Sequence, residues 1–158
     1  MKVLIARAFR RAAAVGLVAL WAPTAVLAGD GMTIVDSRFG VAETEQRLVE
    51  AIEAKGMGVM AQVDHRANAR SVDLDMPPTR VVIFGNPLGG TQLMKCVPTV
   101  AIDLPMKMLI WQDGETVRIA YNRAEYLVER HGIGDCAAPV QAKMKQALDG
   151  LAHTAAGD

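Results

Sequence analysis

The sequence predicts a single α+β domain in which helices pack on a mostly antiparallel sheet. Three observations predict this class. Short stretches with strand character alternate with short helical stretches along the chain. The pair Asp113-Gly114 separates two apolar stretches and is typical of the tight turn of a β-hairpin. Two stretches with helical spacing follow this hairpin, and 158 residues with 51% hydrophobic and 22% charged content suit one globular domain.

The first 28 residues are predicted to form a cleaved signal peptide. Basic residues precede an apolar stretch, Ala12 to Ala22, that is too short to span a bilayer, and Val26-Leu27-Ala28 provides small residues for cleavage. Because Ala-Ala-Ala follows Arg10-Arg11, general secretion is favoured over the twin-arginine route. A retained membrane anchor is the alternative. We therefore expect a periplasmic protein, with no stable membrane insertion after cleavage.

The charge of the remaining chain argues against nucleic acid as a partner. The signal peptide contains four of the 17 basic residues and none of the 17 acidic residues, so the rest carries a formal charge of −4. A mildly acidic chain without a basic cluster does not suit a phosphate backbone. No internal repeat or second domain is indicated, and the domain is expected to cover residues 29–153.

The first part of the domain has alternating strand and helix patterns. Strands are predicted at residues 33–37, 57–64 and 81–84, a helix at 43–55 and a helical turn within 66–74. Gly56 suits a left-handed cap at the end of the helix. In the second strand, Val59, Ala61 and Val63 are expected to share one face.

The second part is predicted to contain a short helix, the hairpin and two terminal helices. The short helix is expected at residues 91–96, after the turn Gly85-Asn86-Pro87, and the hairpin strands at 106–112 and 116–121. Asn122 is expected to cap the first terminal helix and Asp135 the second. Residues 154–158 are predicted to form a frayed tail.

Many short motifs in this order resemble one known family. They are Glu43-Thr44 with Leu48, Asp64-His65, Pro78-Thr79-Arg80, Phe84 to Pro87, Gly90-Thr91 with Leu93-Met94, Asp103-Leu104-Pro105 with Lys107, Trp111 with Asp113, Tyr121-Asn122, and Arg130-His131. On these motifs the chain resembles the domain of unknown function 302 family from about Val35 to Leu151. The resemblance implies a sheet-and-helix fold akin to the TATA-binding-protein-like class. It also implies a possible homodimer and no established activity.

Cys96 and Cys136 leave two alternatives open. In an oxidising compartment two cysteines often form a disulfide, and closing a loop of this length contributes about 4 kcal/mol by the chain-entropy estimate. Alternatively, both are small apolar residues that lie too far apart to bridge. The spacing alone does not decide between them.

Asp64, His65 and Asp103 are the candidate acid/base residues. A carboxylate can orient and stabilise an imidazole, so Asp64-His65 invites a catalytic interpretation. Adjacent residues of a strand point to opposite faces, however, unless the strand ends at Asp64. The alternative is a histidine that only satisfies a backbone carbonyl. His131 is interpreted as structural, because a cation is stabilised near the end of a helix.

The segment from Asn86 to Met94 is one candidate ligand-binding region. Gly90 and Thr91 are expected to expose backbone amides at a helix start, where an anion is favoured. The favoured alternative is a plain turn in which Asn86 ties down the backbone and Pro87 restricts it.

Lys107 and Trp111 form a second candidate region. Both share one strand face, so Lys107 either extends beside the indole or lines a pocket whose floor is Trp111. Asp103 lies beside this strand, next to apolar segments. A charge that is buried at such a position needs a partner of opposite charge.

Metal binding is a weaker alternative. Thioethers bind Cu(I), and eight of the nine methionines follow the predicted signal peptide. His65, Met94 and Cys96 are the candidate ligands, although no standard ligand spacing is present. No cofactor is expected, because neither a dinucleotide fingerprint nor a P-loop is present.

Two main functions remain open on the sequence. The favoured one is a non-catalytic periplasmic binding or accessory module for a small molecule or a periplasmic protein. The alternative is a small enzyme using Asp64, His65 and Asp103. A serine hydrolase is disfavoured, because neither Ser37 nor Ser71 lies in a nucleophile-elbow motif.

Overall fold

The computed structural model describes residues 31–158 and has one five-stranded antiparallel sheet. The strand order is β1-β5-β4-β3-β2, and every neighbouring pair is antiparallel. The strands are β1 (Met32–Ser37), β2 (Gly58–Asp64), β3 (Thr79–Gly85), β4 (Met106–Asp113) and β5 (Thr116–Asn122). The α+β class predicted from the sequence is confirmed.

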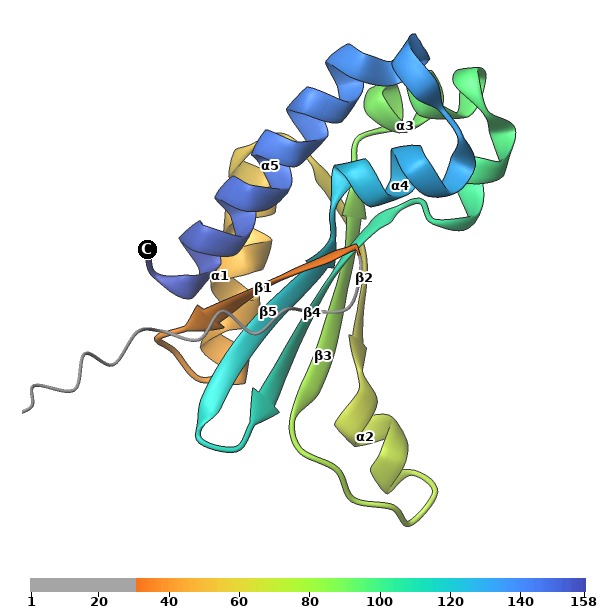
Figure 1. Cartoon of the computed structure of the whole chain (residues 1–158). Coiled ribbons are helices and arrows are strands. Elements are labelled where there is room, and N and C mark those ends of the chain that lie inside the picture. Colours follow the sequence, from red (N-terminus) through yellow and green to blue (C-terminus); the bar gives the residue numbers. More distant parts are fainter. Residues whose placement is uncertain (1–30) are drawn as a thin grey trace, which may run out of the picture.

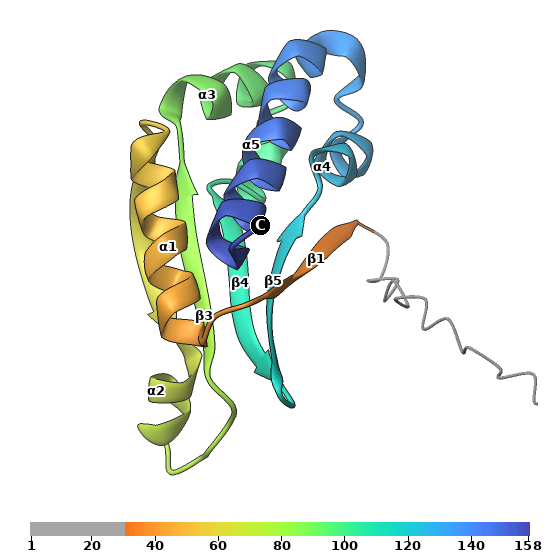
Figure 2. The same ribbon diagram turned by 90° about the vertical axis from the view of Figure 1, so that its left-hand side faces the viewer.

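The two long helices lie on the same face of the sheet (Figures 1 and 2). Helix α1 packs against β2, β3 and β4, whereas α5 packs against β1, β5 and α1. The helical elements are α1 (Val41–Ala54), α2 (His65–Arg70), α3 (Pro87–Cys96), η1 (Pro98–Ile102), α4 (Ala124–His131), η2 (Gly134–Ala137) and α5 (Ala138–Ala156). Within residues 31–158 no helix is long and apolar enough to cross a membrane.

The core lies between this sheet face and the two long helices. Leu48 and Ile52 of α1 are fully buried, as are Met108 and Ile110 of β4 and Leu151 of α5. Their spacing follows the periods of a helix and of a strand, so one stripe or face of each element is buried. Burial of these side chains supplies most of the favourable free energy of folding.

The predicted hairpin is confirmed. Strands β4 and β5 pair from Met108 with Tyr121 to Asp113 with Thr116. Gly114 has a φ of 58°, a left-handed conformation that glycine adopts without steric cost. Gly56, just beyond α1, also has a left-handed φ of 67°, as the sequence predicted.

The predicted caps of the two C-terminal helices are wrong. Asn122 is the last residue of β5, and Arg123 is the N-cap of α4 without a side-chain hydrogen bond. Asp135 lies inside η2, and Ala137 is the N-cap of α5. Strand pairing of Asn122 with Met32 outweighs its local preference for a cap.

The predicted frayed tail is also wrong. Helix α5 continues to Ala156, and both Ala155 and Ala156 are fully buried. The Arg38 amide donates to the Ala156 carbonyl over 3.1 Å, and the Arg38 guanidinium lies 2.8 Å from the Asp158 carboxylate. Contacts with the end of β1 therefore hold the C-terminus in place.

A β-bulge changes the predicted face of β2. Val59 pairs with Phe84, but Ala61 pairs with the adjacent Ile83, so Met60 is an extra residue in β2. The bulge shifts the alternation by one residue, and Val59 packs on the core side while Ala61 belongs to the opposite face. The expectation that Val59 and Ala61 share a face is therefore wrong.

Cys96 and Cys136 are joined by a disulfide, with Cα atoms 6.0 Å apart. The bond connects the last residue of α3 to η2, so it ties α3 to the segment that precedes α5. Of the two alternatives left open by the sequence, the structure therefore has the disulfide.

Candidate functional site

A cavity lies at the end of the sheet beneath α3. Its volume is about 660 Å³, within the range typical of small-molecule sites. Helix α3, the N-terminal half of α5, the chain after α1 and the segment before β4 surround it. Figures 1 and 2 show α3 near the C-terminal end of α1 and the start of α5.

The lining of this cavity is rich in methionine. Five methionines from four different parts of the chain contribute to it: Met57, Met60, Met94, Met106 and Met144. The buried side chains of Phe84, Leu93 and Leu148 also line it. Methionine side chains are flexible and polarisable, so such a surface adapts to apolar molecules of different shapes. We call this cavity the methionine-lined pocket.

Several apolar side chains of the pocket are exposed to solvent. Leu88 is 70% exposed, Met60 54% and Met94 36%. Scattered exposed apolar side chains are ordinary, but these three all line one cavity and expose apolar surface to solvent there. The bulge in β2 brings Met60 to this position. The pocket is therefore open to molecules that bury apolar surface.

Four predicted ligand-binding residues line the pocket: Asn86, Gly90, Thr91 and Met94. The helix that carries them begins at Pro87 and not at Thr91, so the predicted helix start is wrong. The Asn86 side-chain oxygen accepts a hydrogen bond of 2.9 Å from the Leu88 amide, and Pro87 occupies the first turn. Asn86 thus ties down the backbone, as the turn alternative expected, and it does so as the cap of the helix.

The other two predicted ligand-binding residues, Lys107 and Trp111, do not line the pocket. They alternate with the buried Met108 and Ile110 and so belong to the opposite face of the sheet. The Lys107 ammonium donates to the backbone carbonyls of Asp103 and Pro105 over 3.1 and 3.0 Å. Lys107 therefore holds the turn before β4 and does not face the methionine-lined pocket.

The structure does not bring the three acid/base candidates together. Asp64 and His65 lie where β2 meets α2. At this end of the sheet, Asp64 of β2 pairs with Arg80 of β3. Asp103 lies before β4, at the opposite end of the sheet. His65 is exposed to solvent. The proposed acid/base trio thus has no common site.

Asp64 has a structural role in its surroundings. Its carboxylate accepts a 2.9 Å hydrogen bond from the Ala67 amide and caps α2. It also lies 3.1 Å from the Arg80 guanidinium. The hydrogen bond from Ala67, together with the Arg80 charge, lowers the pKa of Asp64 below its ordinary value despite the opposing effect of burial.

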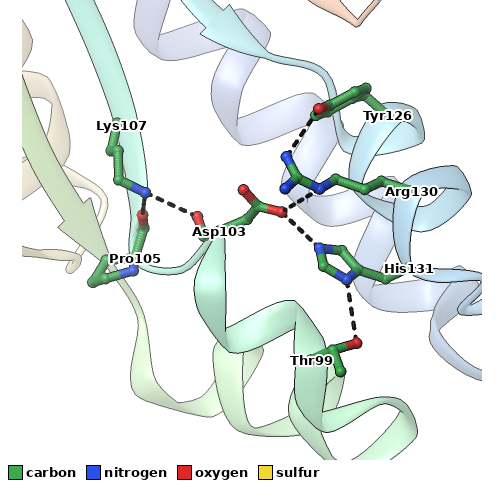
Figure 3. A network of polar contacts seen from close by, with 7 residues as sticks. All are labelled: Thr99, Asp103, Pro105, Lys107, Tyr126, Arg130 and His131. Atoms are coloured by element: carbon green, nitrogen blue, oxygen red, sulfur yellow. Dashed lines mark hydrogen bonds and ion pairs between the residues drawn. The ribbon is translucent and has the colours of Figure 1, made fainter.

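Asp103 pairs with His131 instead (Figure 3). The two side chains approach to 2.6 Å and are only 14% and 7% exposed. The Arg130 guanidinium lies 3.4 Å from the same carboxylate oxygen, and Thr99 Oγ1 lies 3.3 Å from the other imidazole nitrogen. This network joins η1 to the end of α4.

The Asp103 network supports one wall of the pocket. Leu104 and Pro105, which follow Asp103, line the cavity, whereas Asp103 and His131 do not. Figure 3 shows the Lys107 contacts on one side of this turn and His131 on the other. The structural interpretation of His131 agrees with these contacts, but the 28-residue separation hid its partner from sequence reasoning.

The three predicted metal ligands do not converge. Cys96 is in the disulfide, Met94 lines the pocket, and His65 lies at the far end of β2. Among residues 31–158 no group of three or more His, Cys, Asp or Glu side chains could hold a metal ion. The thioether groups of the pocket are the soft donors that the structure does bring together.

A further, partly buried contact links β5 to α5. The Tyr121 hydroxyl donates to the Asp149 carboxylate over 2.6 Å, and the Lys145 ammonium lies 2.9 Å from the same group. Burial and this carboxylate raise the pKa of Tyr121 above its ordinary value. Burial opposes ionisation of Asp149, but the hydrogen bonds from Tyr121 and Lys145 give it a lowered pKa.

A match to a family model shows to which protein family the chain belongs. The model described as "Domain of unknown function DUF302" matches residues 33–151. The chain belongs to the DUF302 family. A crystal structure of an uncharacterised conserved DUF302 protein from Bacillus stearothermophilus has a TM-score of 0.73 to this DUF302 chain at 22% identity. The similarity covers 80% of this chain and 98% of that chain, and it shows the shared fold.

Curated relatives of this DUF302 chain include longer proteins from Brucella. "Fluoride-specific ion channel FluC 1" of Brucella suis biovar 1 is 41% identical over 113 residues, which are 71% of this chain and 44% of that protein. "Fluoride-specific ion channel FluC 2" of Brucella melitensis biotype 1 has the same identity, with 42% of its length matched. The chain thus spans less than half the length of these relatives.

Proposed function

We propose that this DUF302 domain is a non-catalytic binding module that holds a small apolar molecule in the methionine-lined pocket. The observation that carries the proposal is the cavity of about 660 Å³ with apolar side chains exposed at its entrance. Pockets of this size with mainly apolar walls bind small molecules. Enclosing a ligand there would remove the surfaces of Leu88, Met60 and Met94 from water.

The positions of the polar candidates favour binding over catalysis. Asp64 caps a helix and pairs with Arg80, and Asp103 pairs with His131 behind the pocket wall. A general acid or base must lie within hydrogen-bond reach of its substrate. None of Asp64, His65, Asp103 or His131 lines the methionine-lined pocket.

Filling part of the pocket is expected to weaken binding of an apolar probe. N-phenyl-1-naphthylamine, a neutral dye that fluoresces in apolar surroundings, is expected to bind the wild-type domain. Ala147 lines the pocket, so Ala147→Phe would occupy part of the cavity and should weaken dye binding by about tenfold or more. Fluorescence titration measures the dissociation constant of each variant.

The matched control is Ala142→Phe, which adds the same ring at an exposed position of α5 outside the pocket. This variant should bind the dye like the wild type. Equal binding by both variants, or no dye binding by the folded wild-type domain, would contradict the proposal. Circular dichroism would establish that each variant is folded.

A second candidate function is Cu(I) handling by the same pocket. The observation that favours it is the grouping of five methionines in one lining, because thioethers are soft ligands that select Cu(I). We expect a Cu(I) complex tighter than about micromolar, measured anaerobically by competition with a colorimetric Cu(I) chelator. Met94→Leu and Met144→Leu together should weaken it at least tenfold while leaving dye binding nearly unchanged. Binding of Cu(I) that both substitutions leave unaltered would count against this candidate.

We also propose a periplasmic location and an accessory role. The predicted signal peptide, residues 1–28, lies outside the described residues, but the Cys96–Cys136 disulfide suits an oxidising compartment. The chain matches less than half of the length of two proteins called fluoride-specific ion channels, and this supports a domain that works beside other domains or proteins.

A homodimer stays a prediction. The face of the sheet opposite α1 and α5 supports it, because one row across all five strands is apolar: Ile34, Ala120, Leu109, Val81 and Val63.

A further inference from the structure

We infer that the ligand of the methionine-lined pocket is a single-chain amphiphile with a carboxylate head that lies at Lys143. This inference rests on the proposed binding function and specifies its ligand class. The apolar part of the molecule would occupy the cavity, and its anionic head would stay at the entrance.

The inference is based on the charged residues that line the methionine-lined pocket. Lys143 is the charged residue among those that line the pocket, and no carboxylate lines it. A smaller adjoining cavity shares Gln92 and Val140 with the pocket and adds a second cation, Lys95, and again no carboxylate. The linings of the two cavities thus contain two lysines and no carboxylate, although the chain beyond residue 28 is acidic. A local excess of one sign favours ligands of the opposite sign.

Within residues 31–158 these two cations have no acidic partner. The ion pairs of that part of the chain involve other residues, including Lys145, which pairs with Asp149 one turn further along α5. Lys143 is exposed, so its ammonium group is available to a ligand head. A lysine paired within the protein would not be available in this way.

The pocket also changes from apolar to cationic along its depth. Phe84, Leu93 and Leu148 line it and are each 2% exposed, whereas Lys143 is exposed. On α5, Lys143 is three residues after Val140 and four before Ala147, and all three line the pocket, so they follow the same side of the helix. A lysine stem can lie along such an apolar wall with its charge in water. An amphiphile would match this gradient with its chain inward.

The test compares three ligands with the same twelve-carbon chain and different heads. Dodecanoate and dodecyltrimethylammonium, both below their micelle concentrations, and dodecanol, below its solubility limit, are titrated against the bound neutral dye. Wild-type protein is expected to bind dodecanoate about threefold to fivefold more tightly than dodecanol, as for one partly exposed ion pair. The cationic ligand is expected to bind more weakly than dodecanol.

Substitution of the lysine tests its role. Lys143→Met keeps an apolar stem and should remove the preference for dodecanoate, and Lys143→Glu should reverse it. Dodecanol affinity should stay within about twofold of the wild type for Lys143→Met. Lys145→Met is the matched control, because it removes a charge from the same helix outside the pocket, and it should keep the preference.

Two failures are distinguishable. If the wild type binds the dye and dodecanol but binds dodecanoate no more tightly, the inferred ligand class is wrong and the binding function stands. The same conclusion follows if Lys143→Met keeps the full preference. If the folded wild type binds neither the dye nor any of the three ligands, the proposed function itself is wrong.

Discussion

Replacing Cys96 and Cys136 together by alanine is expected to lower the free energy of unfolding by about 4 kcal/mol. The bond joins residues separated by 40 positions. In the chain-entropy estimate, such a crosslink removes conformations mainly from the unfolded chain. For a small domain this loss is a large fraction of the total stability, since domains unfold with about 5–15 kcal/mol.

Urea unfolding followed by circular dichroism measures this difference. Wild-type protein with reductant should lose a similar amount of stability, whereas reductant should leave the double variant unchanged. Intact mass gives an independent check, because reduction of the native bond adds about 2 Da. Equal unfolding midpoints for oxidised wild type and double variant would show that the crosslink contributes nothing to stability.

Arg80→Ala is expected to be the second most damaging change described here, at about 3 kcal/mol. The Glu45 side chain on α1 is 7% exposed, and Arg80 Nη1 on β3 donates to its Oε2 atom over 2.6 Å. In residues 31–158 the other Glu45 oxygen has no hydrogen-bond partner. Removing Arg80 would leave a buried carboxylate unpaired, which costs more than the pair itself contributes.

Arg118→Ala is the matched control for this prediction. Arg118 pairs with Asp36 and Asp113, whose side chains are 70% and 49% exposed, so its removal should cost about 0–1 kcal/mol. Glu45→Gln combined with Arg80→Met should restore part of the stability lost in Arg80→Ala, because no buried charge then remains. Similar losses for Arg80→Ala and Arg118→Ala would show that burial of Glu45 does not matter.

Local patterns in the sequence were sufficient for most of the fold. The hairpin followed from Asp113-Gly114 because the turn needs a residue that tolerates a left-handed φ. The strand at residues 81–84 followed from its continuous apolar character, and these residues lie within β3. The errors at Asn122 and the C-terminus share one cause. Tertiary contacts outweighed local preferences there.

The candidate site was only partly predictable. Asn86, Gly90, Thr91 and Met94 were found because they follow one another in a recognisable turn and helix start. The other methionines of the pocket come from distant segments, and the sequence alone does not bring Met57, Met106 and Met144 together. Asp103 and His131 likewise meet through the packing of η1 against α4.

The bulge at Met60 also protects the sheet from unwanted association. Strand β2 is at one edge of the sheet, and a straight edge offers unpaired amides and carbonyls to the edge of another molecule. An extra residue bends the strand and interrupts the regular spacing of those groups, so a second sheet cannot continue the ladder along the whole of β2. The irregularity that brings a methionine to the pocket thus also hinders aggregation along this edge.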